Sequence, residues 1–132
     1  MISRRRIVKQ EQGQSMVEFA LLLPVLCLVL FGIIQFGIVY NNYITLTDAT
    51  RVGARKAAVS RQTVDPVGLA TAAVRNSAKD LEASKLAVSI EATVWAPGAD
   101  VTVATSYPYE LNIMGVVVAS GRLESSTTER IE

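Results

Sequence analysis

The longest feature of the hydropathy pattern is an uncharged, mostly apolar segment from Phe19 to Tyr40, 22 residues in all. At about 1.5 Å of helical rise per residue, this segment spans roughly 33 Å, the thickness of a bilayer hydrocarbon core. The pattern therefore predicts one membrane-spanning helix over about 19–40. Small and apolar residues recur at helical spacing beyond it, so we expect one continuous helix over 14–60 that leaves the membrane.

The pattern after residue 60 predicts a second, shorter helix. Asp65 followed by Pro66 is typical of an N-cap and the first helical position. Apolar and small residues then share one face up to Leu81, which predicts a helix over about 66–84. This face is expected to pack on a sheet, and the alternative is a groove for a distinct partner.

Residues 88–95 and 101–107 alternate between apolar and polar side chains, which is the period of a half-buried strand. Ala96-Pro97-Gly98-Ala99 separates them and suits a type II turn. The two runs predict a hairpin, and Pro108 is expected to end it. A softer alternation over 121–130 suggests a third strand. The fold class is therefore α+β, with a helix packed on a short antiparallel sheet in an exported domain over 61–132.

Two apolar features of this domain have more than one interpretation. The run from Ile113 to Ala119 is too short to cross a bilayer, so the chain is expected to be single-pass. We expect this run to be core or a covered loop, and the alternative is an exposed contact with another subunit. Trp95 and Tyr107 are expected to be packing residues rather than a ligand-binding pair.

Basic residues precede the apolar segment and set its expected orientation. Arg4, Arg5, Arg6 and Lys9 lie in a leader over 1–13, whereas the remainder is nearly neutral and the net charge is +1. The denser basic cluster should stay cytoplasmic, which places the C-terminal domain in the periplasm or outside the cell. A cleaved secretory signal is the alternative, but its apolar region is usually shorter and ends in small residues. A twin-arginine signal is a further alternative.

The composition argues against most catalytic chemistry. The chain has no histidine and a single cysteine, Cys27, inside the apolar segment. This composition leaves no plausible zinc ligands, no intrachain disulfide and no histidine-based triad. No concentrated basic face suggests nucleic-acid binding. We therefore expect no enzyme activity, cofactor, metal or small-molecule substrate.

Glu18 lies at the start of the apolar segment and has two compatible interpretations. Ser15 and Glu18 fit a capping box, in which Ser15 is the N-cap of the helix. In the second interpretation the chain is cut after Gly13. The new amine of Gln14 would then lie one helical turn from the Glu18 carboxylate, and each charge would satisfy the other or a neighbouring chain.

A basic leader ending in glycine, four further residues, Glu18-Phe19 and an apolar helix resemble the class III signal of type IV pilin-like proteins. The continuation through Pro24 and Gly32-Ile33-Ile34-Gln35-Phe36-Gly37 resembles the TadE-like family of the Flp/Tad tight-adherence pilus. This resemblance implies a prepilin peptidase that cuts between Gly13 and Gln14, and a minor pilin or pseudopilin role. The implied partners are other pilin and minor pilin subunits, the inner-membrane assembly platform and the lipid bilayer.

The helix-packing positions follow from the same segment. Pro24 is expected to kink the helix. Gly32 and Gly37 are either ordinary membrane glycines or close helix contacts, because their spacing is not that of the dimer motif. Gln35 either bonds a partner helix or lies near the interface with Tyr40, and many relatives have an acid at this position. The candidate assembly residues are Glu18, Phe19, Pro24, Gly32, Gln35 and Gly37. The alternative function is an uncleaved signal-anchored envelope protein whose tail binds another envelope component.

Overall fold

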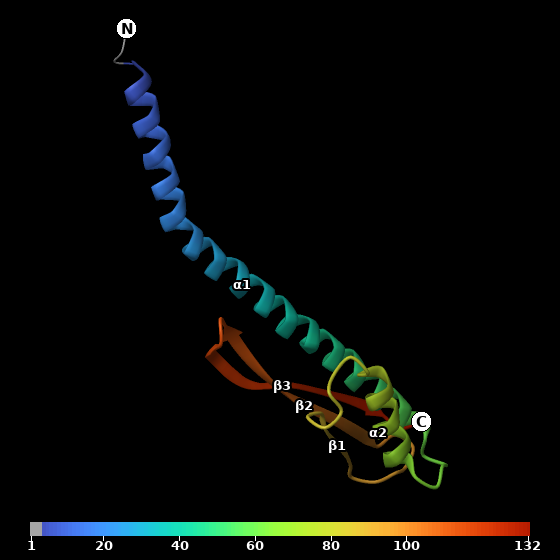
Figure 1. Cartoon of the computed structure of the whole chain (residues 1–132). Coiled ribbons are helices and arrows are strands. Elements are labelled where there is room, and N and C mark those ends of the chain that lie inside the picture. The colour runs from blue at the N-terminus through green and yellow to red at the C-terminus, as the bar shows by residue number, and fades with distance from the viewer. Residues whose placement is uncertain (1–3) are drawn as a thin grey trace.

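The structure, a computed structural model, describes residues 4–132, with side chains from residue 13 onward. The basic side chains predicted to orient the leader therefore lie outside the described part. Five elements follow in chain order: α1 (Arg4–Val59), α2 (Pro66–Ser77), β1 (Ala87–Ala92), β2 (Asp100–Ile113) and β3 (Val116–Arg130). The predicted α+β class, with a long N-terminal helix and a small antiparallel sheet, is confirmed (Figure 1).

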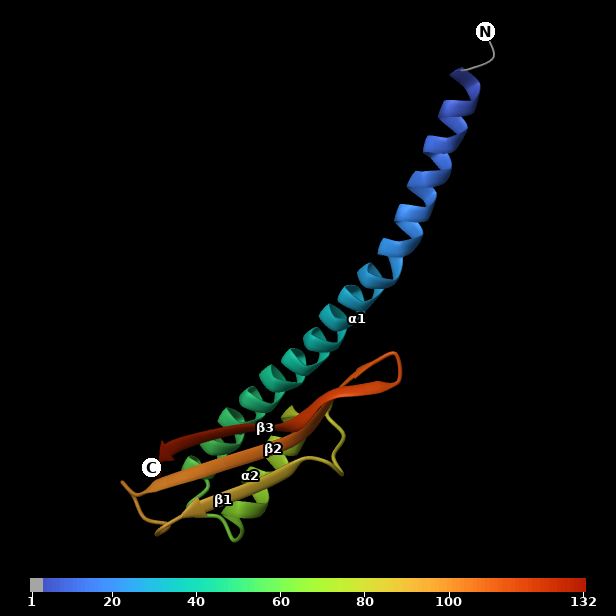
Figure 2. The ribbon, with the colours of Figure 1, turned by 90° about the vertical axis from the view of Figure 1, so that its left-hand side faces the viewer.

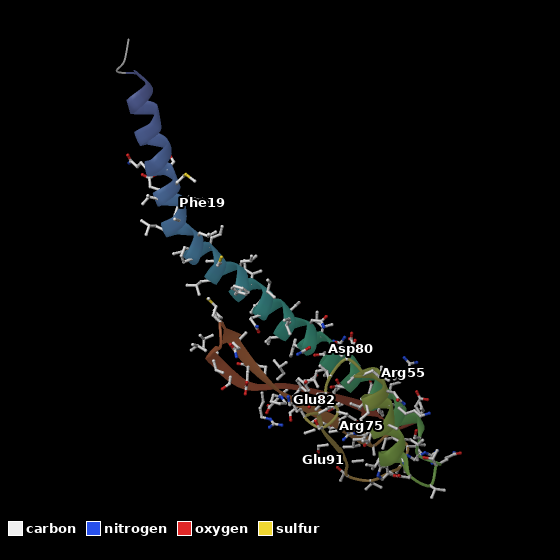
Figure 3. The ribbon with its side chains drawn as sticks, in the orientation of Figure 1. Phe19, Arg55, Arg75, Asp80, Glu82 and Glu91 are labelled. Atoms are coloured by element: carbon white, nitrogen blue, oxygen red, sulfur yellow. The ribbon has the colours of Figure 1, made fainter. Side chains whose placement is uncertain are left out.

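Helix α1 runs without interruption over 56 residues and contains Pro24. Figure 1 shows that its axis bends in the N-terminal half, and Figure 3 labels Phe19 just before the bend. Proline removes one backbone donor and crowds the carbonyl four residues earlier, which bends a helix at that point. The predicted kink is therefore present.

Helix α2 begins as predicted and ends earlier. The Asp65 side chain accepts a hydrogen bond from the Gly68 N–H at 2.8 Å, and Pro66 occupies the first turn. The helix ends at Ser77 rather than near residue 84. Asparagine and serine, at 76 and 77, have low helix propensity, and the Ala78 N–H donates to the Val74 carbonyl at 3.0 Å where the helix ends.

The three strands form one antiparallel sheet in the order β1-β2-β3. β1 pairs with the first half of β2, from Ala92 opposite Val101 to Ala87 opposite Ser106. β2 pairs with β3 along its whole length, with a bulge between Leu111 and Asn112. The third strand is confirmed, although it begins at residue 116 instead of 121.

The connection between β1 and β2 contains the predicted turn. The Ala99 N–H donates to the Ala96 carbonyl at 3.1 Å, and Gly98 has a φ of 82°. These are features of a type II turn, in which a glycine at the third position accepts the positive φ. The pairing of β1 with β2 ends sooner than expected, because the strands stop at Ala92 and resume at Asp100.

Pro108 does not end the second strand, and this prediction is wrong. β2 continues through it as far as Ile113, with Pro108 opposite Arg122 of β3. β1 begins opposite Ser106, so beyond that point β2 has a neighbour on one side only. Proline is tolerated there because a strand edge has no partner waiting for its missing N–H.

The apolar run from Ile113 to Ala119 is neither core nor a covered loop, so the preferred interpretation was wrong. It forms the far end of the β2–β3 hairpin, whose two-residue turn has positive φ at Met114 (51°) and Gly115 (89°). The Asn112 side chain closes the turn by accepting from the Gly115 N–H at 2.9 Å. Positive φ at both central residues is the geometry that matches strand twist in tight hairpins. The large apolar residues Met114 and Val116–Val118 are exposed.

One face of the sheet is covered by the C-terminal part of α1 and by α2 (Figure 2). α1 lies on β2 and β3, whereas α2 packs against α1 and reaches only β1. The core between these layers consists mainly of small and aliphatic side chains: Leu46, Ala49, Ala54, Ala57, Ala58, Ala70, Val74, Ala78, Leu81, Leu86, Val101, Val103 and Ile131. Trp95 and Tyr107 pack against this core, as expected.

The C-terminal residues fasten the sheet to the end of α1. The Ile131 N–H donates to the Ala99 carbonyl, and the Gly98 N–H donates to the Ile131 carbonyl, both at 2.8 Å. The Glu132 N–H donates to the Ala58 carbonyl at 3.1 Å. The end of the chain thus ties the β1–β2 connection to the last turn of α1, which makes the packed end one unit.

Candidate functional site

The candidate processing segment lies within α1. Gly13 and Gln14 are exposed, and a Cβ added at Gly13 would meet nothing within 4 Å. The helix runs through both residues, so the Gly13–Gln14 peptide bond is helical in the uncleaved chain. Glycine in a helix interior costs about 1 kcal/mol relative to alanine. Gly13 is therefore a point at which α1 opens more readily than an ordinary helical position.

Glu18 is exposed and is held by its own helix. Its Oε1 accepts a hydrogen bond from the Gln14 Nε2 at 3.1 Å, across one helical turn. Because α1 begins at Arg4, Ser15 lies inside the helix and not at its N-cap, so the predicted capping box is absent from the uncleaved chain. The carboxylate thus lies at the edge of the apolar surface and contacts the Gln14 side chain. Cleavage after Gly13 would free the backbone amine of the same Gln14.

The apolar segment of α1 is largely uncovered by protein. Its large side chains are exposed, except for the partly exposed Val39; Leu21 is 72% exposed and Leu26 60%. A core helix of similar composition would be mostly buried, whereas none of the most apolar window of α1 is buried. Among the residues that the structure describes, α1 is the one helix long and apolar enough to cross a membrane. These features fit a single-pass membrane protein.

A shallow apolar groove of about 350 Å³ lies beside Pro24 on the surface of α1. Its lining is entirely hydrophobic: Phe19, Leu22, Leu23, Val25, Leu26 and Val29. In lipid, helices associate through shape and close packing rather than through the hydrophobic effect. The groove suits a lipid acyl chain or the apolar ridge of a second membrane helix.

The other predicted packing positions are spread along α1 and do not form one cluster. A Cβ at Gly32 or Gly37 would meet nothing within 4 Å, so neither glycine makes a close contact within this chain. Gln35 is half-buried, and the rings of Phe36 and Tyr40 stack with centroids 6.4 Å apart. Glu18 and Gln35 are about 25 Å apart along the helix, so they cannot act together within one chain.

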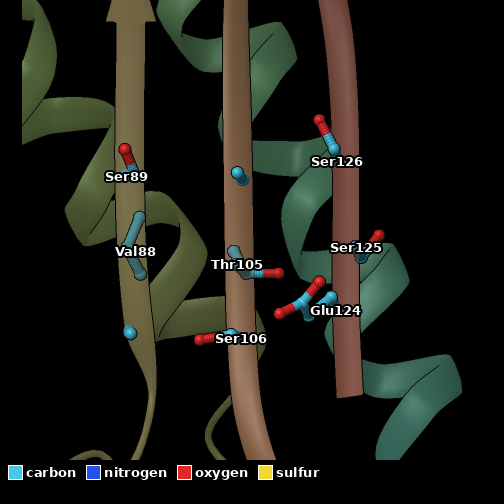
Figure 4. A pocket seen from close by; sticks show the side chains of 9 residues that line it. Val88, Ser89, Thr105, Ser106, Glu124, Ser125 and Ser126 are labelled. Carbon is cyan, nitrogen blue, oxygen red and sulfur yellow. The ribbon is translucent and has the colours of Figure 1, made fainter. Parts of the chain in front are cut away.

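The open face of the sheet carries a groove that sequence reasoning missed. Figure 4 shows that its lining residues come from all three strands. Its volume is about 460 Å³. The row of Val88, Thr105 and Ser125 faces α1, as the buried Thr105 shows, so the open face at this point is formed by the rows on either side. Those rows carry mostly small side chains such as Ser89 and Ser126. Alternation alone identified the outward residues. The strand register that brings them into rows has no signal in a single sequence.

Charged groups gather at the end of the molecule far from Phe19, as the labelled residues in Figure 3 show. The tightest pair joins Lys85 Nζ and Glu82 Oε2 at 2.7 Å. Hydrogen bonds from Lys85 and Ser84 hold the pKa of Glu82 below its usual value, and the bond to Glu82 raises the pKa of Lys85. Among the described residues no three His, Cys, Asp or Glu side chains are grouped to hold a metal.

The fold is α+β, and its exposed apolar helix fits a membrane-anchored protein. A family model described as TadE-like protein matches residues 13–55, from Gly13 to Arg55, which lie entirely within α1. The resemblance to the TadE-like family is thereby confirmed over that segment. No curated protein and no solved structure shows significant similarity to the chain.

Proposed function

We propose that the protein is a TadE-like minor pilin or pseudopilin, processed by a prepilin peptidase and taking part in the assembly of Flp/Tad pili for surface adherence. The observation that carries this proposal is that the family match and the exposed apolar surface of α1 begin within a few residues of each other. The family match begins at Gly13, and the uncovered apolar surface of α1 follows directly, with Glu18 at its edge. A surface of this kind requires lipid or other helices as its environment.

Cleavage between Gly13 and Gln14 would leave Gln14 as the first residue of α1. Its new ammonium group would lie one turn from the Glu18 carboxylate, which already accepts a hydrogen bond from the Gln14 side-chain amide. The N-terminal end of a helix also favours a negative charge, so cleavage makes the position of Glu18 more favourable. The ammonium and carboxylate can therefore neutralise each other, within one chain or between neighbouring chains.

Before assembly, the apolar surface would face lipid, and during assembly it would face the helices of other subunits. A carboxylate at the edge of an apolar environment needs a partner, since desolvating an unpaired charge is expensive. Glu18 would therefore set the depth at which α1 packs beside a neighbouring pilin helix. This proposal includes other pilin subunits and the inner-membrane assembly platform as partners, with the basic leader on the cytoplasmic side.

The processing step is tested by determining the N-terminal residue of the membrane-extracted protein, by intact mass and terminal peptide sequencing, with and without the prepilin peptidase. We expect a start at Gln14 that depends on the peptidase. Gly13→Ala should reduce this product, whereas Gly37→Ala, at an equally open glycine of α1, should not. A leader that stays intact in both strains would instead favour the uncleaved signal-anchored protein.

The assembly step is tested with Glu18→Ala and Glu18→Gln in cells that express the pilus. We expect both variants to reach the membrane and both to lower piliation, with Glu18→Gln less severe because it keeps a hydrogen-bonding group. Asp48→Ala is the matched control, because Asp48 is an exposed acid outside the apolar segment. Normal piliation in a well-expressed Glu18→Ala strain would reject the assembly role.

A further inference from the structure

The end of the β2–β3 hairpin is the second exposed apolar surface of the molecule. No charged residue lies between Glu110 and Arg122, and this stretch forms the hairpin end. Met114 is 72% exposed and Val117 51%. Four large apolar side chains that remain uncovered at one end of a small unit mark a contact with something outside the chain.

The position of this hairpin relative to α1 is fixed by buried contacts. Thr50 of α1 and Thr105 of β2 share a hydrogen bond of 2.6 Å. Three residues further along α1, a Cβ on Gly53 would lie 3.5 Å from Val103 Cγ1. β2 therefore runs antiparallel to α1, towards its apolar half. Figures 1 and 2 both show the hairpin end beside the middle of α1, beyond the part on which the rest of the sheet packs.

The end of the apolar segment of α1 and the last charge of β2 fall at the same level. Along α1, the distance from Thr50 back to Tyr40, where the apolar segment ends, is about 15 Å. Along β2, the distance from Thr105 to Glu110, the last charge of the strand, is about 16 Å. From Thr105 to Ile113 is about 26 Å, so the hairpin end reaches about 10 Å past the level of Tyr40. The uncharged part of the hairpin therefore lies beside the uncharged part of α1.

We propose that the hairpin end, residues 111–121, is a second membrane contact that dips into the leaflet from which α1 emerges. This inference rests on the proposed membrane placement of α1. The occupant is lipid because the surface lies at the depth of the apolar helix, where a water-soluble partner would have to enter the bilayer. Pairs such as Ile113 with Val116 satisfy the inward-facing backbone groups of the hairpin, and a shallow insertion leaves its two outer edges within reach of water.

The residues that flank the hairpin end suit the polar boundary of a bilayer. Tyr109 lies opposite Gly121, against which its ring packs, and Arg122 follows directly. Aromatic side chains such as Tyr109 and Tyr40 concentrate at the level of lipid headgroups, and arginine extends its charged end into water. Two membrane contacts, α1 and the hairpin, would fix the tilt of the packed unit above the bilayer. A single helical anchor would leave that tilt free.

The experiment places an environment-sensitive fluorophore at Val117→Cys in full-length protein carrying Cys27→Ala, reconstituted in vesicles of phosphatidylcholine and phosphatidylglycerol. Matched labels at Val29→Cys and Ser126→Cys report the apolar half of α1 and the open face of the sheet. We expect the label at Val117 to emit at shorter wavelength than the label at Ser126. It should be quenched by spin-labelled lipid and protected from aqueous iodide.

The label at Val29 separates failure of this inference from failure of the membrane placement on which it rests. A lipid-buried Val29 label with a Val117 label open to iodide would overturn the hairpin contact and leave the anchor intact. A Val117 label protected from both quenchers would overturn it in favour of a protein contact. Iodide access at both Val29 and Val117 would overturn the membrane placement of α1 and the hairpin contact together.

Discussion

Helix α1 is continuous, but its N-terminal half is exposed and its C-terminal half is packed against the rest of the protein. From Met16 to Ile44 its large side chains are exposed, whereas from Leu46 to Ala58 one side is buried completely. The exposed half is rich in leucine, isoleucine and phenylalanine. The buried stripe is mostly alanine, glycine and threonine. The size of the side chain therefore distinguishes the two surfaces better than its hydrophobicity does.

This difference follows from what each half touches. The packed half lies against α2 and β2, both with fixed shapes, and small residues allow those backbones to approach closely. A Cβ at Gly53 would overlap Val74 Cγ2, which shows how little space remains between α1 and α2. A fluid environment fits itself around large side chains, so the exposed half needs no such restriction. Substitutions matched between the two halves test this account.

The largest expected difference comes from truncating one leucine in each half. Leu46 is 0% exposed, so Leu46→Ala should lower the free energy of unfolding of the packed unit by about 2 to 5 kcal/mol. Leu26→Ala, in the exposed half, should change it by less than about 0.5 kcal/mol. Urea unfolding of the detergent-solubilised full chain, followed by Trp95 fluorescence, measures both. Equal losses would show that the exposed half also supports the fold.

Adding one methyl group to a glycine should have different consequences in the two halves. Gly53→Ala should destabilise the packed unit by about 1 to 3 kcal/mol, because Val74 must move and overpacking outweighs the gain in helix propensity. Gly37→Ala meets nothing within 4 Å and should not lower stability. Thermal unfolding by near-UV circular dichroism compares the two variants. A stabilised Gly53→Ala protein would contradict the close approach of α1 and α2.

A smaller effect is expected at the buried hydroxyl pair. The Thr50 Oγ1 donates to the Leu46 carbonyl at 2.7 Å, so its bond with Thr105 must use the Thr105 hydroxyl as donor. Thr50→Val leaves that donor without its acceptor and should cost about 1 kcal/mol, the net value of one hydrogen bond. Urea unfolding of the single and double valine variants gives the coupling. Strictly additive losses would show that the two hydroxyls do not interact.

The sequence predicted α1, the start of α2 and the β1–β2 turn because each depends on local signals. The apolar segment from Phe19 to Tyr40, the Asp65-Pro66 pair and the Pro97-Gly98 pair act on their own neighbours in the chain. Errors appeared where a distant segment decides the outcome. β1 begins opposite Ser106, so one edge of β2 is open at Pro108 and the proline is tolerated within the strand. No local sequence pattern shows where β1 begins relative to β2.

The predictions for the candidate site also succeeded where the signal is local and failed where another part of the chain decides. The position of Glu18 at the edge of the apolar surface was visible in the sequence, because both features lie on one helix. The capping box failed because the helical leader makes Ser15 an interior residue. The run from Ile113 to Ala119 has the composition of a core segment, and periodicity cannot distinguish burial in protein from exposure to lipid. The buried contact between Thr50 and Thr105 gave the depth of that run relative to α1.

The smallest expected effect lies on the outer side of the packed half itself. Arg51 Nη1 and Asp48 Oδ1 are 3.8 Å apart and both side chains are about two-thirds exposed, so water screens their attraction. Arg51→Gln should therefore change the free energy of unfolding by less than about 0.5 kcal/mol, although Arg51 adjoins the buried Thr50. Urea unfolding of Arg51→Gln and of Leu46→Ala compares two positions that lie about one and a half helical turns apart. A loss at Arg51 as large as that at Leu46 would mean that position along α1, rather than the buried stripe, determines stability. A negligible loss would assign the stabilisation to the stripe that faces α2 and the sheet.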